Sequence, residues 1–353
     1  MRAVDILLST SWSASRQVKT KFRQPFSNIM YMMNIHDAIE NYCSPILWPD
    51  LKPSRLASRI IDLHRERDFL DKLEPQAFAA AGHNFCGIGL LGLADDAGVH
   101  LNGGRPGAAG GPNAFRTALS AYGAADSVAL QDFNVPLVDL GNIIPGDSLT
   151  ETHARVTETV AAMLTAGLMP IGIGGGHDLT FPEVRAVIDN LTRPNGQTLA
   201  GVYFDAHLDV REDEGSGMPF RRLIEHGGIG GLQLFGFDPL SNTPAHLEWF
   251  EDHGGERVDW PPTQWPPSQA QFVSICLDVI DMAQAPGVSA PHPAGWSAQR
   301  LADYAEAAGR MPSVCCFDIM ELSPPFDEAA RTARLAVYLF MRFLAGLNRR
   351  PKT

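Results

Sequence analysis

Short apolar runs alternate with longer segments of helical periodicity along most of the chain. The apolar runs are rich in Val, Ile, Leu and Phe, and they lie near residues 85–91, 136–140, 168–174, 199–204, 231–236, 271–277 and 313–319. Most of the gaps repeat apolar residues every three or four positions, as helices with one buried face do. These predicted helices span residues 112–122, 149–166, 179–190, 244–253, 297–309 and 329–347. Strands that alternate with helices predict a parallel sheet with helices on both faces.

The chain length fits a single large domain. With 353 residues, 45% of them hydrophobic, the chain can bury one core, and no break in composition requires a second. We therefore assign residues 34–353 to one domain, in which residues 34–82 form a helical lead-in. Residues 1–33 carry five Lys or Arg against one acidic residue. Two interpretations of this extension stay open, an organelle-targeting segment and a mis-assigned translation start.

Charge and cysteine usage narrow the classes of function. The net charge is −12 at pH 7 and no dense Lys/Arg face is evident, so nucleic acids and anionic membranes are poor partners. A small-molecule substrate is favoured instead. Five cysteines scattered over a chain of this length do not form a disulfide framework, which fits a reducing cytoplasm. No apolar run approaches the roughly 18 residues that a membrane span needs.

The most informative motif follows the apolar residues 202–204. Asp205, His207 and Asp209 stand at alternate positions just after them. In an extended segment alternate side chains point the same way, so two carboxylates and one imidazole would converge at the end of a buried strand. This donor set suits a divalent metal ion. The competing interpretation is a strand that simply emerges into solvent.

Two further apolar runs end in residues of the same kind. Residues 170–178 break into three consecutive glycines before His177, and glycine lets the backbone turn tightly beside a ligand. Residues 272–281 place Cys276 and Asp278 at alternate positions. Ligands bind at the carboxyl ends of the strands in open parallel sheets, where all these side chains would lie. Three strands that each end in side chains able to bind a metal ion predict a shared metal site.

These motifs, in this order, resemble those of the ureohydrolase superfamily, which includes arginase, agmatinase and formimidoylglutamase. Residues 96–99 and 102–108 resemble the family's glycine-rich first loop, and the resemblance covers roughly residues 85–347. It implies a homo-oligomer and a three-layer α/β/α fold with a mostly parallel sheet of about eight strands. It also implies two divalent metal ions, normally Mn²⁺, whose shared hydroxide attacks a planar amidine or guanidine carbon. Carried over by position, the implied ligands are His177, Asp205, His207, Asp209, Cys276 and Asp278.

Two carboxylates are the predicted catalytic residues. By resemblance, Glu321 corresponds to the residue that pairs with the cationic nitrogens of the substrate, and Asp209 is expected to be catalytic as well as a ligand. A carboxylate accepts two parallel hydrogen bonds from a planar amidinium, so the residue type suits this role. The competing interpretation of Glu321 is a solvated glutamate after a strand.

Several segments resemble the formimidoylglutamase branch of the family. Residues 216–220 resemble its S-G-T-P-F segment, whereas arginases and agmatinases usually have a proton-shuttling histidine at position 216. Residues 241–243 and 331–336 also resemble this branch. The residues that we expect to bind substrate are Ser216, Asn242 and Arg331.

A substrate with a glutamate moiety brings two carboxylates. Arginine side chains are therefore expected at the mouth of the pocket, because guanidinium groups bind carboxylates in a two-pronged geometry. The candidates in this sequence are Arg211, Arg221, Arg222 and Arg331. For each of them, a solvated surface arginine is the competing interpretation.

Cys276 stands where the family normally has an aspartate that bridges both metal ions. A thiolate can also bridge two cations, but it favours Zn²⁺ or Fe²⁺ over Mn²⁺ because sulfur is a softer ligand than oxygen.

The leading prediction is a metal-dependent hydrolase of the amidine C–N bond of N-formimidoyl-L-glutamate, giving L-glutamate and formamide as its relatives do in histidine degradation. Two alternatives stay open: a guanidine hydrolase of the agmatinase or guanidinobutyrase kind, and a catalytically silent relative in which Cys276 is structural.

Overall fold

The structure is a computed structural model. It describes residues 33–350 except 47, 50, 53–54, 74–76, 124–132, 267 and 269. The predicted N-terminal extension, residues 1–33, therefore lies outside the described residues apart from Met33. Met32–Thr353 forms one compact unit. None of its described helices combines the length and the apolar character that crossing a membrane requires.

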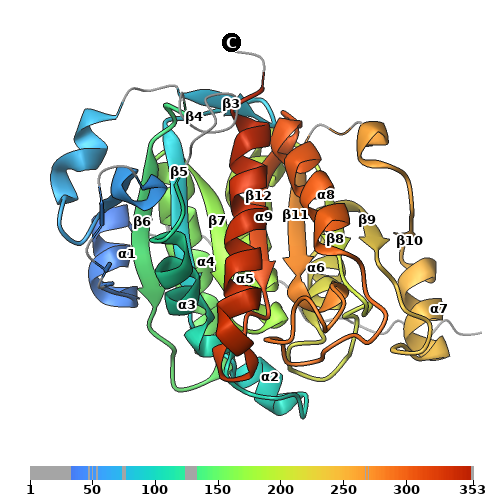
Figure 1. Ribbon diagram of the computed structural model, residues 1–353. Coiled ribbons are helices and arrows are strands. Elements are labelled where there is room, and N and C mark those ends of the chain that lie inside the picture. Colours follow the sequence, from blue (N-terminus) through green and yellow to red (C-terminus); the bar gives the residue numbers. More distant parts are fainter. Residues whose placement is uncertain are drawn as a thin grey trace, which may run out of the picture. The chain divides into compact units, whose positions relative to one another are not determined.

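A ten-stranded sheet forms the middle of this unit (Figure 1). Its strands are β1 (Cys43–Ser44), β2 (Ile60–Asp62), β5 (Gly87–Leu93), β6 (Leu137–Ile143), β7 (Leu168–Gly174), β8 (Leu199–Phe204), β9 (Ile229–Phe235), β10 (Gly255–Arg257), β11 (Gln271–Cys276) and β12 (Val314–Met320). They lie in the order β1-β6-β5-β7-β12-β11-β8-β9-β10, with β2 also paired to β6. Among the described residues, the pairing of β1 with β6 is antiparallel and the other pairings in this sheet are parallel. A separate hairpin pairs β3 (Phe78–Ala80) with β4 (His83–Phe85).

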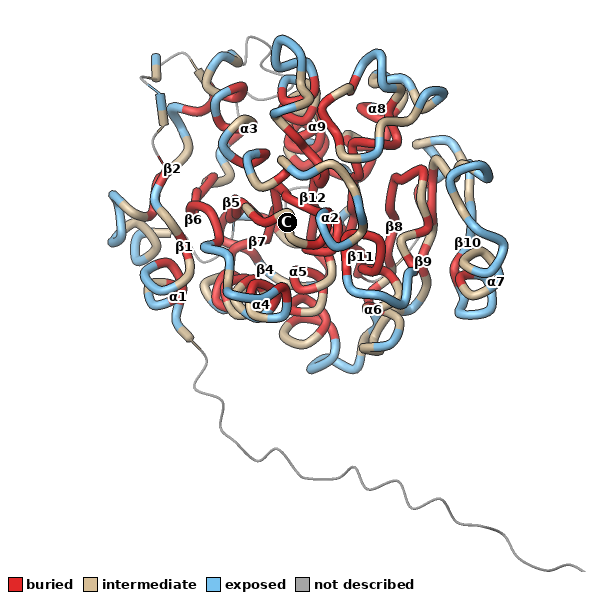
Figure 2. The backbone as a smooth tube through the Cα atoms, turned by 90° about the horizontal axis from the view of Figure 1, so that it is seen from below, coloured by how far each residue is buried: buried red, intermediate tan, exposed pale blue. Residues whose placement is uncertain are grey.

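Helices cover both faces of the sheet, so the unit has three layers (Figure 2). One face carries α3 (Gly111–Leu119), α8 (Ala298–Arg310) and α9 (Arg331–Leu347), and α9 packs against both of the others. The other face carries α1 (Ile35–Tyr42), α4 (Leu149–Thr165), α5 (Thr180–Val187) and α6 (Pro219–His226). The short α2 (Ala97–Leu101) follows β5, and α7 (Pro244–Asp252) packs on the edge strand β10.

The central strands are buried throughout and mostly apolar, because helices cover both of their faces. Every residue of β5, β6, β7 and β12 is buried, as expected for parallel strands between two helical layers. Among the described helices, α1, α4, α7 and α8 begin at a polar side chain that caps the first turn. At the start of α4, Ser148 Oγ accepts a hydrogen bond from the Glu151 N–H, and the Glu151 carboxylate accepts one from the Asp147 N–H. The predicted three-layer α/β/α fold is confirmed.

The predicted elements match the observed ones best in the centre of the sheet. β7 and β8 coincide with the predicted runs 168–174 and 199–204. The predicted number of strands, about eight, is too low, because the edge strands β1, β2 and β10 are only two or three residues long and show no alternating pattern. The eight-residue helix α6 was also not predicted.

The predicted helical lead-in at residues 34–82 is wrong for most of its length. Among the described residues of this stretch, α1 alone is α-helical, and short strands and 3-10 turns make up the rest. Pro45 and Pro49 follow α1 closely and cannot continue helical hydrogen bonding. Pairing with β6 then recruits β1 and β2 to the edge of the sheet. Tertiary contacts therefore override the local helical pattern.

Candidate metal centre and active-site pocket

Four neighbouring strands, β7, β12, β11 and β8, deliver polar side chains to one edge of the sheet. Because these strands are parallel, their carboxyl ends lie together. His177 follows β7, Glu321 follows β12, Cys276 ends β11 and Asp205 follows β8. All four side chains are buried. The strand order, which the sequence pattern does not reveal, explains how residues so far apart in the chain meet.

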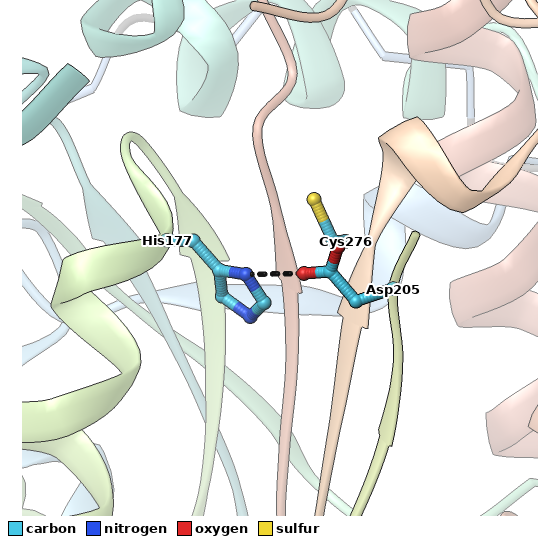
Figure 3. Close-up of side chains that lie close together, drawn as sticks. All are labelled: His177, Asp205 and Cys276. Carbon is cyan, nitrogen blue, oxygen red and sulfur yellow. Dashed lines mark ion pairs between the residues drawn. The ribbon is translucent and has the colours of Figure 1, made fainter. Parts of the chain in front are cut away.

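The first group of candidate ligands surrounds the His177 ring. Its Nδ1 atom lies 2.9 Å from Asp205 Oδ2 and 2.9 Å from Asp209 Oδ2. Figure 3 shows the imidazole and the Asp205 carboxylate facing each other, with Cys276 beside the carboxylate. One ligand atom from each of these three residues lies within 4.8 Å of the other two. Since metal–ligand bonds are about 2.0–2.3 Å long, atoms this close can share one ion.

The second group shares Asp205 with the first. His207 Nδ1 lies 3.2 Å from Asp205 Oδ1 and 3.2 Å from Asp278 Oδ2. Ligand atoms of these three residues also lie within 4.8 Å of one another. The structure thus brings the six predicted ligands together around two positions that have one aspartate in common.

The ligands converge from turns and not from extended strands. β8 ends at Phe204, and Asp209 has a φ of 48°, in the left-handed region. Leu277–Val279 is a 3-10 turn, so Cys276 and Asp278 are not alternate residues of one strand. The premise that an extended segment aligns these ligands is therefore wrong, although the residues it selected do lie together. A strained backbone such as that of Asp209 costs about 1–3 kcal/mol and is typical of functional sites.

Acidic groups crowd together in this buried cluster. Burial raises the pKa of Asp209 to about 6 and also raises the pKa of Asp278, and the negative charge of Asp205 adds to both shifts. Burial likewise raises the pKa of the Cys276 thiol well above its usual range. Burial alone would lower the pKa of His177, but the carboxylates of Asp205 and Asp209 raise it well above its usual range. Divalent cations between these groups would neutralise the crowded negative charge.

Three buried ligand atoms have no hydrogen-bond partner among the described residues. They are Asp278 Oδ1 together with His177 Nδ1 and Asp205 Oδ2, whose 2.9 Å contact with each other lacks the geometry of a hydrogen bond. Buried polar atoms are normally satisfied, because leaving one without a partner costs about 1–3 kcal/mol. All three belong to the two groups of candidate ligands, and imidazole nitrogen with carboxylate oxygen is a donor set that divalent metals accept. The residues present therefore fit a pair of divalent cations.

A chain of hydrogen bonds fixes the orientation of the His177 ring. Its Nε2 atom lies 3.0 Å from Ser274 Oγ, which donates to Asp318 Oδ1 at 2.5 Å. Thr180 Oγ1 donates to the other oxygen of Asp318 at 3.0 Å. With the Ser274 hydroxyl given to Asp318, His177 Nε2 donates its proton to Ser274, which leaves Nδ1 as the atom that can bind a cation. Sequence reasoning missed this chain, although Ser274 stands two residues before Cys276.

Asn242 lines the pocket, but its side-chain amide holds the turn that carries His207. Its Oδ1 accepts from the Leu208 N–H at 2.9 Å, and its Nδ2 donates to the carbonyl oxygens of Ala206 and Asp238, both at 2.8 Å. Leu208 and Ala206 flank His207 in the chain. Both N–H donors of the amide are thus engaged by the backbone, so the geometry supports a positioning role for Asn242, and its substrate-binding role stays a prediction.

Asn242→Ala is expected to lower metal affinity roughly 10- to 100-fold, as is typical when the support of a ligand is removed. The reason is that three backbone groups around His207 and Asp238 lose their partner. Titration against a competing chelator measures the effect. Asn190→Ala is the control, since the Asn190 amide donates to Ala186 O on α5, away from the cluster. Unchanged metal affinity together with a raised KM would instead return Asn242 to a substrate-binding role.

Glu321 lies at the floor of the pocket in a fixed orientation. It has a φ of 70°. One carboxylate oxygen accepts from the His177 N–H at 3.0 Å, and the other accepts from the Ser289 hydroxyl. Burial raises the pKa of Glu321 to about 8, against the lowering effect of the Ser289 hydrogen bond. Ser289 comes from a loop without periodicity, and sequence reasoning missed it.

A cavity of about 340 Å³ opens above the two ligand groups. This volume suits a small molecule. Besides ligands from both groups and Glu321, its lining includes Asn102, Arg105, Arg211, Ser216, Asn242, His246 and Ser289. The pocket therefore contains the predicted Ser216 and Asn242 together with the candidate metal cluster.

The predicted arginines divide between the pocket and the surface. Arg211 lines the cavity, whereas Arg331 lies outside it and donates to Ala283 O and Glu328. Arg221 and Arg222 are also absent from the described lining, and both pair with Glu225. The structure thus brings one of the four predicted arginines to the pocket.

Arg105 is a pocket arginine that sequence reasoning did not single out. Its Nε and Nη2 donate to the carbonyl oxygens of Ser289 and Val288 at 3.2 and 2.6 Å, and its guanidinium lies 4.0 Å from the centre of the Phe326 ring. Arg211 is held more loosely, by one 3.3 Å hydrogen bond to Asn102 Oδ1. The position of Arg105 inside a glycine-rich segment, between Gly104 and Pro106, is the signal that could have found it.

Known proteins resemble this chain over most of its length. The model of the arginase family matches residues 87–261 and 263–346. The chain is 33% identical over 275 residues to a formimidoylglutamase of Nocardia farcinica, covering 72% of this chain and 85% of that protein. It is 32% identical over 270 residues to a formimidoylglutamase of Salmonella paratyphi B, covering 71% and 83%.

Solved structures of formimidoylglutamases are also similar to this chain. The crystal structure of Trypanosoma cruzi formiminoglutamase with Mn²⁺ aligns with a TM-score of 0.67 at 32% identity, covering 75% of this chain and 94% of that one. Formimidoylglutamase from Bacillus subtilis aligns with a TM-score of 0.69 over 88% and 96% of the two chains. Its identity of 24% makes this second match a likeness of fold alone.

Proposed function

The chain belongs to the arginase family, and on that premise we propose that it hydrolyses the amidine C–N bond of N-formimidoyl-L-glutamate, giving L-glutamate and formamide. The observation that carries the proposal is the charge pattern of the pocket. Glu321 lies beside the candidate metal cluster, and two guanidinium groups line the same cavity. A substrate with a cationic amidinium end and two carboxylates matches this pattern. The formimidoylglutamases among the relatives support the same substrate over a guanidine.

The six clustered side chains are proposed to hold two divalent cations. One position lies by His177, Asp205, Asp209 and Cys276, and the other by Asp205, His207 and Asp278. Two cations bound there would lower the pKa of a water molecule between them and so supply hydroxide near neutral pH. The Mn²⁺ in the Trypanosoma cruzi structure supports manganese as one of these ions.

Glu321 is proposed to orient the amidinium. Each oxygen of its carboxylate accepts one protein hydrogen bond, from the His177 N–H and from the Ser289 hydroxyl. A carboxylate oxygen has room for a second donor, so both oxygens can also accept the two parallel N–H groups of an amidinium. The planar formimidoyl carbon is thereby held next to the metal cluster, and its orientation is fixed before reaction.

Asp209 is proposed to carry a proton to the leaving group. It lies in the cluster, where its Oδ2 is 2.9 Å from His177 Nδ1, and it also lines the pocket. Water adds its oxygen to the formimidoyl carbon, the bond from that carbon to the glutamate nitrogen breaks, and this nitrogen needs a proton to leave as an amine. A carboxylate that faces both the attacking water and the leaving nitrogen can take the proton from one and give it to the other.

Arg105 and Arg211 are proposed to bind the two carboxylates of the substrate. Arg105 contacts Ser289, the residue that holds Glu321, so it lies toward the amidine end of the pocket. The α-carbon of the substrate bears the amidine nitrogen, so its α-carboxylate is the nearer anion and is assigned to Arg105. The exposed Arg211 is assigned to the γ-carboxylate.

Arg105→Met and Arg211→Met are each expected to lower kcat/KM roughly 10- to 100-fold, the loss expected for one hydrogen-bonded charge. N-formimidoyl-4-aminobutyrate lacks the α-carboxylate and separates the two roles. With this analogue, Arg105→Met should cause little further loss, whereas Arg211→Met should keep its full effect. Arg331→Met, outside the pocket, is the matched control. Equal losses with both substrates for Arg105→Met would contradict its assignment.

The substrate itself is tested by product analysis on a small panel. Purified metal-loaded protein is incubated with N-formimidoyl-L-glutamate, agmatine, 4-guanidinobutyrate and arginine, and NMR follows formamide, glutamate and urea. Formamide and glutamate in equal amounts from the first compound, with no urea from the others, are the expected result. Urea from a guanidine at a higher kcat/KM would replace the proposed function with guanidine hydrolysis.

A further inference from the structure

The two proposed cation positions differ in their donor atoms. The group around His177 combines an imidazole, the carboxylates of Asp205 and Asp209 and the sulfur of Cys276, whereas the group around His207 consists of an imidazole and the carboxylates of Asp205 and Asp278. Sulfur therefore belongs to one described group and is missing from the other. A thiolate is a soft ligand and carboxylates are hard ligands, so the two positions should prefer different metals.

The surroundings of Cys276 differ from those of other buried cysteines in this chain. Cys86 Sγ donates to the carbonyl oxygens of Ala166 and Gly167, both at 3.2 Å, and Cys315 Sγ donates to Gln271 O at 3.5 Å. Such contacts are those of structural thiols. Cys276 is 1% exposed and lies among ligand-type groups instead.

Independent atoms beside Cys276 also point to a ligand. His177 Nδ1 and Asp205 Oδ2 belong to the same group as the sulfur, and both are buried without a hydrogen-bond partner among the described residues. Ser274 fixes the His177 ring with Nδ1 facing Asp205. The sulfur thus lies within 4.8 Å of a ligand atom of each of these two residues, and the contacts of His177 Nδ1 and Asp205 Oδ2 given above are with other candidate ligands.

We propose that the centre is heterobinuclear: the position by His177, Asp205 and Cys276 takes a thiophilic divalent cation such as Zn²⁺, and the position by Asp205, His207 and Asp278 takes Mn²⁺. The proposal rests on the proposed two-cation site and not on the identity of the substrate. The Cys276 thiol also contacts the Asp278 carboxylate. The competing arrangement is therefore a sulfur that bridges both cations. In that arrangement both positions have a sulfur ligand, and their metal preferences should not differ for that reason.

Cobalt titration of the metal-free protein separates these arrangements, because a thiolate bound to Co²⁺ absorbs in the near ultraviolet while oxygen and nitrogen ligands do not. With both positions filled, the charge-transfer band is expected to saturate at the intensity of one Co²⁺–thiolate bond. Saturation at the intensity of two such bonds would show sulfur at both positions and overturn the proposal. Absence of the band from the parent protein would show that Cys276 is no ligand and would overturn it as well.

Competition between metals gives a second readout. Zn²⁺ binds more tightly than Mn²⁺ at most protein sites, but it gains most from a thiolate ligand. Protein loaded with two Mn²⁺ per chain and titrated with Zn²⁺ is therefore expected to exchange one Mn²⁺ at a much lower Zn²⁺ concentration than the other. Cys276→Asp should lose the cobalt band, lower the preference for Zn²⁺ over Mn²⁺ at least about 10-fold, and retain two Mn²⁺ per chain. Cys86→Ser is the matched control and should behave like the parent. Exchange of both Mn²⁺ ions of the parent at the same Zn²⁺ concentration would overturn the proposal.

Formamide release measured on the same samples keeps the two conclusions apart. If the protein hydrolyses N-formimidoyl-L-glutamate but does not show the band of one thiolate-bound Co²⁺, the heterobinuclear centre is wrong and the proposed function stands. If the protein shows that band but does not hydrolyse N-formimidoyl-L-glutamate, the proposed function is wrong and the mixed-metal centre stands.

Discussion

Asp205→Ala is expected to abolish binding of both cations and to lower kcat/KM for N-formimidoyl-L-glutamate at least roughly 10³-fold. Asp205 is the residue that both ligand groups share, with one oxygen 2.9 Å from His177 Nδ1 and the other 3.2 Å from His207 Nδ1. Removing it takes a negative ligand from both positions at once. Elemental analysis of the purified protein, together with the formamide assay, measures the two effects.

The fold itself should survive this substitution. Removing Asp205 relieves the repulsion that raises the pKa of Asp278 and Asp209, but it also removes the contacts of Asp205 with His177 and His207. The metal-free variant should therefore unfold cooperatively, at a lower thermal midpoint than the metal-free parent, because breaking a buried ion pair costs about 3–5 kcal/mol. Asp303→Ala on the surface of α8, where Asp303 pairs with Arg342, is the control. A variant that still binds two ions and turns over would show that Asp205 is not the shared ligand.

Glu321→Gln is expected to lower turnover roughly 30- to 1,000-fold, because losing the charge that faces the amidinium costs on the order of 2–4 kcal/mol. Metal content should stay at the parent level, since Glu321 belongs to neither ligand group. Glutamine has nearly the same shape, its amide oxygen can still accept from the His177 N–H, and its NH₂ can donate to Ser289 Oγ. The substitution thus isolates the charge.

Glu328→Gln on the surface provides the control, since Glu328 pairs with Arg331 outside the pocket. Steady-state kinetics and elemental analysis are made on the same preparations. An unchanged rate for Glu321→Gln would place Glu321 outside the chemistry. A lower metal content would instead make its role structural.

The parts of the fold that the sequence predicts are those where burial imposes a strong pattern. β7 and β8 are covered on both faces, so each reads as a continuous apolar run with sharp ends. The region 34–82 could not be predicted in this way, because its short strands at the edge of the sheet depend on pairing with β6. Local periodicity carries no information about such a partner.

In the candidate site, too, residues that lie close together in the chain could be predicted, whereas contacts between residues far apart in the chain could not. Asp205, His207 and Asp209 could be selected from local spacing, yet they converge through a turn in which Asp209 has a positive φ, and not through an extended strand. Glu321 was predicted mainly because the sequence resembles a known family, and not from geometry. The glycine-rich segment could have pointed to Arg105, but its contact with Ser289 could not be found from patterns, because the two residues meet only where two loops far apart in sequence contact each other.

The most direct test of the account is to follow hydrolysis of N-formimidoyl-L-glutamate by NMR while the metal-free protein is loaded stepwise with divalent cations. The account predicts no turnover without metal, and equal release of formamide and L-glutamate that rises with loading and reaches its maximum at two bound ions per chain. Turnover by the metal-free protein at the rate of the loaded protein, or no release of either product with two ions bound, would contradict it.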